Sequence, residues 1–169
     1  MPRGISRRKF LVITSSALTV MFIGGISYFL FFSTSKRLPE IHYGVDTCDW
    51  CHMVIMDKRF ACVYWSANEK KWRKFDDIGC MIRDLLKMGI GNAGDIYVSD
   101  YSTGILIDGR TAYYVVADPK KLWTPMSSGI AAFNNKAGAM DLVQQYQASL
   151  MNFNELLSMF KTMTTTMSM

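Results

Sequence analysis

The sequence predicts an α+β domain built from two strand–strand–helix (ββα) repeats and preceded by one N-terminal transmembrane helix. An uncharged run near the N-terminus predicts the membrane helix, and short aromatic and β-branched segments alternating with helical ones predict the domain. The repeats are suggested by two similar junctions, Phe75-Asp76-Asp77 and Phe133-Asn134-Asn135, each of which precedes a predicted helix. A chain of 169 residues has room for one modest domain plus an anchor.

The anchor is predicted at residues 10–32, which are 23 residues without a charged side chain. At about 1.5 Å per residue this run spans a hydrocarbon core of roughly 30 Å. Arg7-Arg8-Lys9 precede the run and only Lys36-Arg37 follow it, so the positive-inside rule places the domain outside the cytoplasm. Residues 6–11 resemble a twin-arginine export signal. Because no small-residue cleavage site follows, we expect an uncleaved signal-anchor in the cytoplasmic membrane, with a single pass and the N-terminus inside.

Charge separates the anchor from the rest of the chain. Six of the 19 basic residues precede Leu38, whereas all 14 acidic residues follow it. The exported part is therefore nearly neutral and offers no basic face for a nucleic acid. We divide the chain into a basic segment (1–9), a membrane span (10–32), a linker (33–46), a domain (47–148) and a Met/Thr-rich tail (149–169). The tail is expected to be disordered or a weak amphipathic helix.

Within the domain, each half has its own strand and helix signals. In the first half, strands are expected over 59–65 and 71–75, and a helix over 78–87, capped by Asp76 or Asp77 and ended by Gly89. In the second half, strands are expected over 95–99 and 112–116, with a turn at Asp108-Gly109. The segment 130–133 then leads into a helix, capped by Asn134 or Asn135, that runs to about residue 148.

The residues that carry chemistry are concentrated in Cys48-Asp49-Trp50-Cys51-His52-Met53. Two thiolates and a thioether are soft ligands that favour Cu(I), whereas zinc sites do not use Met. Thr124-Pro125-Met126-Ser127-Ser128-Gly129 offers a second soft donor on a turn. If the two loops meet at the axis of a duplicated fold, Cys51, Met53 and Met126 suffice for Cu(I), with Cys48 or His52 assisting.

Three other interpretations fit parts of the same pattern. Cys-x-x-Cys-His is the haem c attachment motif, but the domain reads as β/α and a twin-arginine signal carries folded cargo. Cys48 and Cys51 also suit a membrane-tethered thiol–disulfide oxidoreductase, although Val54-Ile55-Met56 reads as a strand and not as the helix such a pair prefers. A zinc site would need Cys62 and Cys80, which form no second close pair. These two cysteines are expected to be small buried hydrophobic residues.

Five stretches resemble the NosL family of copper chaperones associated with nitrous oxide reductase assembly. They are CDWCHM (48–53), KFDDIGCM (74–81), YVSDY (97–101), AYYVV (112–116) and TPMSSGIAAF (124–133). The resemblance implies two ββα repeats similar to the fold shared with organomercurial lyase, Cu(I) binding near the first motif, and a carrier with no enzymatic activity. Cys51 and Met53 match the family's Cys-x-Met, Met126 matches its Pro-Met, and Cys48 matches a longer Cys-x-x-Cys-x-Met form.

The chain departs from the family pattern in two ways. The better-known members are lipoproteins held through an N-terminal Cys, whereas this chain has a predicted membrane span. Ser127-Ser128 stand where the family commonly has a Gly after Pro-Met. The expected partners are a client copper enzyme or a membrane copper transporter, and the client is nitrous oxide reductase or another exported copper enzyme such as a terminal oxidase.

Overall fold

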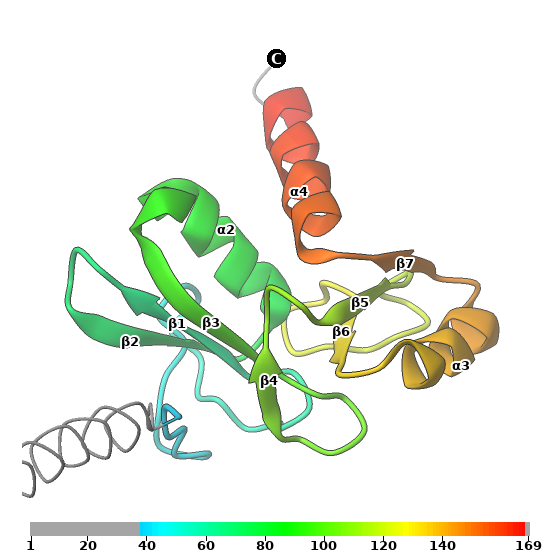
Figure 1. Ribbon diagram of the computed structural model, residues 1–169, viewed down its shortest axis with the longest axis horizontal. Helices are drawn as coiled ribbons and strands as arrows, with labels where there is room; N and C mark the ends of the chain where they lie inside the picture. The colour runs from blue at the N-terminus through cyan, green and yellow to red at the C-terminus, as the bar shows by residue number, and fades with distance from the viewer. Residues whose placement is uncertain (1–37, 168–169) are drawn as a thin grey trace, which may run out of the picture. The chain divides into compact units, whose positions relative to one another are not determined.

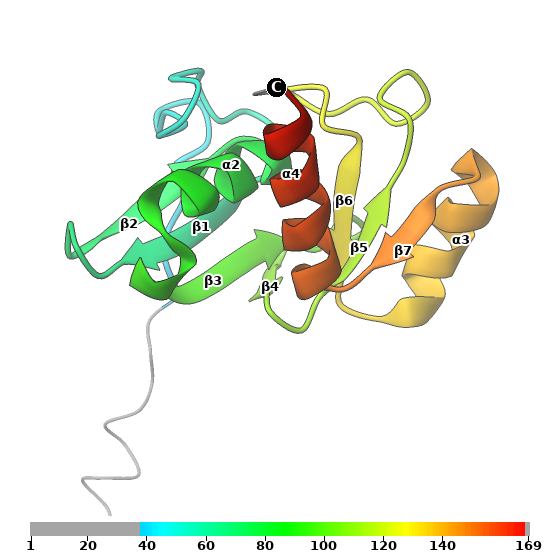
Figure 2. The ribbon, with the colours of Figure 1, turned by 90° about the horizontal axis from the view of Figure 1, so that it is seen from above.

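The computed structural model describes residues 38–167, which form a mixed α+β domain with two antiparallel sheets (Figures 1 and 2). The larger sheet has the strand order β2-β1-β3-β4, and the smaller has the order β6-β5-β7. Its elements are β1 (Cys62–Ser66), β2 (Lys71–Phe75), α2 (Ile78–Met88), a 3-10 turn (Ile90–Asn92), β3 (Ala93–Ser99), β4 (Leu106–Asp108), β5 (Tyr113–Val116), β6 (Ile130–Phe133), α3 (Lys136–Tyr146), β7 (Ser149–Met151) and α4 (Phe153–Met167).

The predicted anchor lies outside the described residues, as does the basic segment before it. Among residues 38–167, no helix has both the length and the apolar character needed to cross a bilayer.

The two halves of the domain share one topology. In each half the chain runs strand, strand, helix, strand, and the first strand becomes the central one, with the second and third strands on either side. β1 thus lies between β2 and β3, and β5 lies between β6 and β7, all in antiparallel pairs. The first half has the strand–strand–helix order predicted from the sequence. In the second half this order is formed by β5, β6 and α3. Residues 95–99, predicted as the first strand of that half, belong instead to β3 in the larger sheet, and residues 130–133, predicted to lead into the helix, form a strand.

Local sequence explains where the helices begin and end. The side chain of Asp77 accepts a hydrogen bond from Gly79 N at 2.6 Å and caps α2, whereas Asn135 caps α3 through Gly138 N at 2.8 Å. α2 ends at Gly89, whose φ of 86° suits glycine. The caps predicted from the sequence are therefore confirmed, with the second residue of each Asp or Asn pair as the cap.

The segment after residue 148 packs onto the domain. β7 pairs with β5, and α4 places Phe153, Leu156, Leu157 and Phe160 in the main core beside α2. Asn152 and Glu155 form a reciprocal capping box at the start of α4, because Asn152 N donates to Glu155 Oε2 and Glu155 N donates to Asn152 Oδ1. Of the two alternatives for this tail, the structure has a helix, and the helix closes the core.

Candidate metal centre

A short hairpin before β1 carries the Cys-x-x-Cys motif. Thr47 and Val54 form an antiparallel bridge, and Cys48 N donates to Met53 O at 2.8 Å. The chain turns through His52, which has a φ of 63°, and His52 N donates to Cys48 O at 2.9 Å. This turn buries Cys48 completely and leaves Cys51 half-buried.

The first turn of α2 brings a third thiol to the hairpin. The ligand atoms of Cys48, Cys51, Asp76 and Cys80 all lie within 4.8 Å of one another. Cys51 Sγ donates to Asp76 Oδ1 at 3.5 Å, and all four cysteines of the chain are free thiols. We call these four residues the thiol cluster. Its three sulfur atoms form a soft donor set of the kind that selects Cu(I) or zinc over hard cations.

The thiols of the cluster differ in acidity because of their mutual contacts. A hydrogen bond from the Cys80 thiol lowers the pKa of Cys48 to about 7, and the same bond raises the pKa of Cys80. Burial raises the pKa of Cys51 to about 11, with the negative charge of Asp76 adding to the effect. The thiol that ionises most easily is therefore the buried Cys48, which Cys80 stabilises as a thiolate.

A buried ionic network holds the hairpin against the sheet. Arg73 forms a two-bond ion pair with Asp84, with Nε to Oδ2 at 2.8 Å and Nη2 to Oδ1 at 3.0 Å, and Tyr64 donates to the same carboxylate at 2.6 Å. Arg73 also reaches Asp49 O at 3.4 Å inside the Cys-x-x-Cys turn. The Asp49 side chain accepts from Lys74 N at 2.7 Å. These contacts tie the turn to β2 and, through Asp84, to α2.

The loop containing Met126 lies at the same end of α2. Met126 N donates to Asp77 Oδ2 at 3.0 Å, so the Asp77 carboxylate both caps α2 and binds the Met126 loop to the start of this helix. A Cβ on Gly79 would lie 2.7 Å from Ser128 Cβ, which shows how closely the loop approaches the helix. Met126 is half-buried and packs against the core cluster that contains Cys48 and Cys80.

The structure places each metal-binding residue predicted from the sequence either in the thiol cluster or in a segment beside it. Cys48 and Cys51 lie in the thiol cluster, and the loop of Met126 is anchored one residue from Asp76. Met53 is 52% exposed and His52 is exposed, both beside the cluster in the hairpin turn.

Sequence reasoning missed Cys80 and Asp76 as members of the cluster. Cys80 is buried as expected, but it contacts Cys48, whereas Cys62 is buried outside the cluster. The available signal was the spacing from the cap, since a residue three positions after Asp77 lies in the first turn of α2, where it can meet a segment that packs on the helix start.

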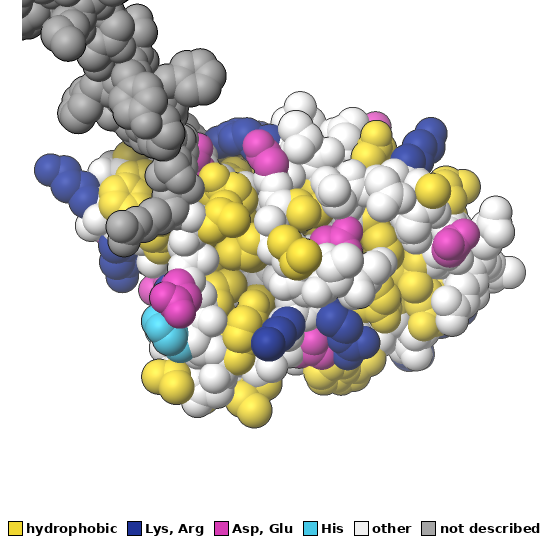
Figure 3. Space-filling view, turned by 60° about the horizontal axis from the view of Figure 1, so that its bottom comes forward, with side chains coloured by type: hydrophobic (Ala, Val, Ile, Leu, Met, Phe, Trp, Pro, Cys, Tyr) yellow, Lys and Arg dark blue, Asp and Glu magenta, His cyan; other side chains and the backbone are white. Residues whose placement is uncertain are grey.

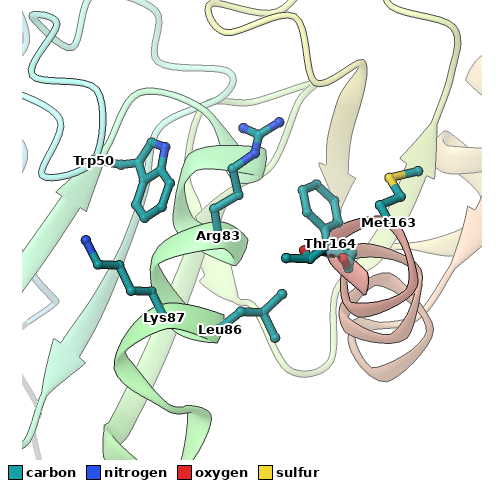
Figure 4. Close-up of a pocket in the computed structure, with 7 residues that line it drawn as sticks. Trp50, Arg83, Leu86, Lys87, Met163 and Thr164 are labelled. Carbon is teal, nitrogen blue, oxygen red and sulfur yellow. Dashed lines mark hydrogen bonds between the residues drawn. The ribbon is translucent and has the colours of Figure 1, made fainter. Parts of the chain in front are cut away.

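A hollow of about 460 Å³ between α2 and α4 borders this centre (Figure 4). Trp50 of the hairpin forms one side of it, and Phe160 and Met163 of α4 form the other. Arg83 and Lys87 line the same hollow, and each stacks on a ring, Arg83 on Phe160 and Lys87 on Trp50.

The fold and the cluster define a class of protein, namely a small α+β domain with a cluster of three thiols at a helix start. The family model for NosL matches residues 42–159, and the chain belongs to the NosL family. Among solved structures it is similar to the copper chaperone NosL from Shewanella denitrificans, with a TM-score of 0.62 and 21% sequence identity over 70% of this chain and 95% of that one. At this identity the likeness establishes the fold. No curated protein sequence matches the chain significantly.

Proposed function

We propose that this chain is a membrane-anchored, extracytoplasmic carrier of Cu(I) that delivers copper to an exported copper enzyme. The observation that carries the proposal is the convergence of three thiols from two separate segments, in a domain of the NosL family. A solved structure with the same fold is described as a copper chaperone. The anchor at residues 10–32 and the extracytoplasmic location rest on the sequence.

The proposed chemistry is ligand exchange without catalysis. In the proposed site the thiolates come from Cys48, Cys51 and Cys80. The adjoining loops add the thioethers of Met53 and Met126 and the side chain of His52, which either bind the ion or cover it. Cys51 is the thiol of the cluster that is not fully buried, so we assign it as the ligand that a partner displaces first. Asp76 is a hard oxygen donor that suits Cu(I) poorly. We assign it to accept the hydrogen bond of the Cys51 thiol and so to orient this thiol while no copper is bound.

The arrangement of acidities argues against the alternative of a thiol–disulfide oxidoreductase. Such an enzyme attacks through an exposed thiolate of lowered pKa. Here the lowered pKa belongs to Cys48, which is fully buried, whereas burial raises the pKa of the more accessible Cys51. The accessible thiol is thus poorly suited to nucleophilic attack.

X-ray absorption of the Cu(I)-loaded chain tests the proposal directly. We expect a first shell of sulfur donors, and we expect Cys51→Ser and Cys48→Ser each to lower affinity in a competition titration with a chromophoric Cu(I) chelator. Met53→Ala and Met126→Ala should lower it less, because thiolates bind Cu(I) more strongly than thioethers. Cys62→Ser is the matched control, since Cys62 is buried outside the cluster.

Two outcomes would overturn the proposal. One is a wild-type chain that binds no Cu(I) anaerobically. The other is copper binding that is unchanged in both Cys48→Ser and Cys51→Ser, which would place the metal elsewhere. Disulfide turnover that depends on Cys48 and Cys51 but ignores Met53 and Met126 would instead support the oxidoreductase.

A further inference from the structure

Exposed apolar side chains are concentrated at the start of the domain. Nine large hydrophobic side chains are exposed among the described residues, and five of them fall within residues 38–56. The five are Leu38, Val45, Met53, Val54 and Met56. Figure 3 shows hydrophobic side chains on the side of the domain that is lowest in Figure 1, where these first residues lie. Single exposed hydrophobic residues are ordinary, but a concentration of them marks an interaction surface.

The hairpin that carries the Cys-x-x-Cys turn explains how this surface arises. Besides the Thr47–Val54 bridge, Ile55 N donates to Asp46 O at 2.9 Å, so residues 45–48 lie opposite 53–56. Burial alternates from residue 45 to 48 and from 54 to 56, with Cys48 and Ile55 facing inward at 0% exposure. The outward positions are all exposed, and they are Val45, Thr47, Val54 and Met56. A hairpin with one face in the core normally turns polar side chains to water on the other, whereas here three of the four outward side chains are apolar.

We propose that this outer hairpin face, formed by Val45, Thr47, Val54 and Met56, rests on the lipid surface of the membrane that holds the anchor. The proposal deepens the proposed function and rests on its membrane anchor. It also assigns an orientation to the carrier, because the Cys-x-x-Cys turn at the hairpin tip then lies at the membrane surface. The chemistry it implies is copper exchange with a membrane-embedded partner such as a copper transporter.

The length of the tether favours lipid as the occupant. From the predicted end of the span at residue 32 to Val45 there are about 13 residues, which reach at most roughly 45 Å when fully extended. A domain of this size has a diameter of roughly 30 to 40 Å, calculated from a radius of gyration near 14 Å. The hairpin is therefore held within about one domain diameter of the bilayer, where an effective concentration in the millimolar range compensates for weak affinity.

One basic side chain next to the hairpin can meet a lipid phosphate, whereas the neighbouring acids Asp46 and Asp57 are paired with Lys74 and Arg59. Lys58 follows the hairpin and stacks over Tyr43 at 5.3 Å, and it forms no ion pair with a carboxylate of the described residues. Arg59, in contrast, is neutralised by Asp57 at 2.7 Å. Lys58 is thus placed to meet a lipid phosphate beside an apolar patch, which is the combination found at membrane interfaces.

Methionine oxidation tests the contact within a single molecule. The full chain is reconstituted in nanodiscs of phosphatidylethanolamine and phosphatidylglycerol, treated with hydrogen peroxide, and followed by mass spectrometry. Met56 is 71% exposed and Met163 of α4 is 53% exposed, so Met163 serves as an internal control of similar accessibility. If lipid covers the hairpin, Met56 should oxidise about fivefold or more slowly than Met163, because oxidation follows exposure.

A charged variant distinguishes contact from chance protection. Val45→Asp combined with Val54→Asp should detach the hairpin and bring the oxidation rate of Met56 back to that of Met163. Neither residue belongs to the thiol cluster, so Cu(I) stoichiometry should equal that of the wild type. Equal oxidation of Met56 and Met163 in the wild-type chain overturns the proposal.

Photocrosslinking identifies what covers the face. Val54→p-benzoylphenylalanine in the same nanodiscs should give a lipid adduct, whereas Lys161→p-benzoylphenylalanine on α4 should not. An adduct to the chain itself or to a second copy would replace lipid as the occupant and overturn the proposal. Failure of the proposed function looks different, since a chain that binds no Cu(I) but protects Met56 would lose the carrier role and keep the membrane contact.

Discussion

The two halves of the domain share a topology and a way of docking one loop, but only the first half carries cysteines. In the first half, Asp49 N donates to Lys74 O at the end of β2. In the second half, Tyr101 N donates to Ala132 O at the equivalent place on β6. The first docked loop supplies Cys48 and Cys51 to the thiol cluster. In the second docked loop, the side chain of Asp100 instead accepts hydrogen bonds from the backbone N–H groups of Ser102 and Thr103 in the same loop.

The difference extends to the helix starts and the core. With the caps Asp77 and Asn135 aligned, Cys80 corresponds to Gly138 and Asp76 to Asn134. Aligned through the strand registers, the buried network of the first half corresponds to buried apolar residues of the second. Tyr64, Arg73 and Asp84 have as counterparts Val115, Ala131 and Leu142. The two halves thus share a topology, and the buried Tyr–Arg–Asp network between sheet and helix is present in the half that contains the candidate site.

The largest expected effect comes from breaking that buried charge. Asp84→Ala should lower the free energy of unfolding by about 3 kcal/mol, because it removes the buried partner of Arg73 and leaves only the more exposed Glu69 to pair with it at 2.8 Å. Replacing the network with apolar residues, as the second half does, should restore much of the loss in Tyr64→Phe/Arg73→Met/Asp84→Leu. Chemical denaturation measures both. A cost below about 1 kcal/mol for Asp84→Ala would show that the network is dispensable for the first half.

Copper binding should follow the sulfur difference between the helix starts. Cys80→Ser removes the thiol that the second half lacks, and we expect Cu(I) affinity to fall by roughly 100-fold or more, because losing a ligand should cost at least as much as losing a residue that only orients one. Cys62→Ser should change affinity little, since this buried thiol lies outside the cluster. Chelator competition gives the values. An unchanged Cu(I) affinity in Cys80→Ser would show that Cys80 is a buried hydrophobic residue and not a copper ligand.

One glycine in each half tests the packing of the Met126 loop. In Gly79→Ala the new Cβ would meet Ser128 Cβ at 2.7 Å, so the loop must move away from α2, and Cu(I) affinity should fall by about tenfold if Met126 is a ligand. In Gly138→Ala the nearest atom lies at 3.4 Å, and helix propensity should stabilise the chain by up to about 1 kcal/mol. Thermal unfolding and copper titration of the pair separate the two effects. Equal copper affinities would exclude a role for the loop position.

The smallest effect concerns the acid at the helix start. Asp76→Asn copies Asn134 and removes the negative charge that helps to raise the pKa of Cys51. Without this charge the thiolate is less disfavoured, so the pKa should fall from about 11 by about one unit. Burial, the larger cause, is unchanged and keeps the pKa above its ordinary value. The pH dependence of alkylation in the copper-free chain measures it, and an upward shift would contradict the assigned role of Asp76.

Sequence predicted the parts of the fold that depend on local chemistry. The hairpin of β1 and β2, the caps Asp77 and Asn135 and the end of α2 at Gly89 follow from turn and capping preferences that act within a few residues. Three-residue strands such as β4 and β7 were missed because they carry too short a pattern and are formed by their partners.

The candidate site was predictable only in part for a related reason. The pair Cys48 and Cys51 is adjacent in sequence and visible as a motif, whereas Cys80 reaches it through the packing of α2 on the hairpin. From sequence alone, Cys80 and Cys62 are equivalent buried thiols. Only the tertiary arrangement distinguishes the one that contacts Cys48.

The position of α4 has a consequence for the order of events during biosynthesis. Phe153, Leu156, Leu157 and Phe160 complete the core over α2, the helix that carries Cys80. Ribosomes make these residues after every member of the thiol cluster, so the cluster cannot be enclosed in a finished core while the nascent chain still ends before Phe153. A chain shortened before α4 should expose its thiols and be recognised by proteases as unfinished.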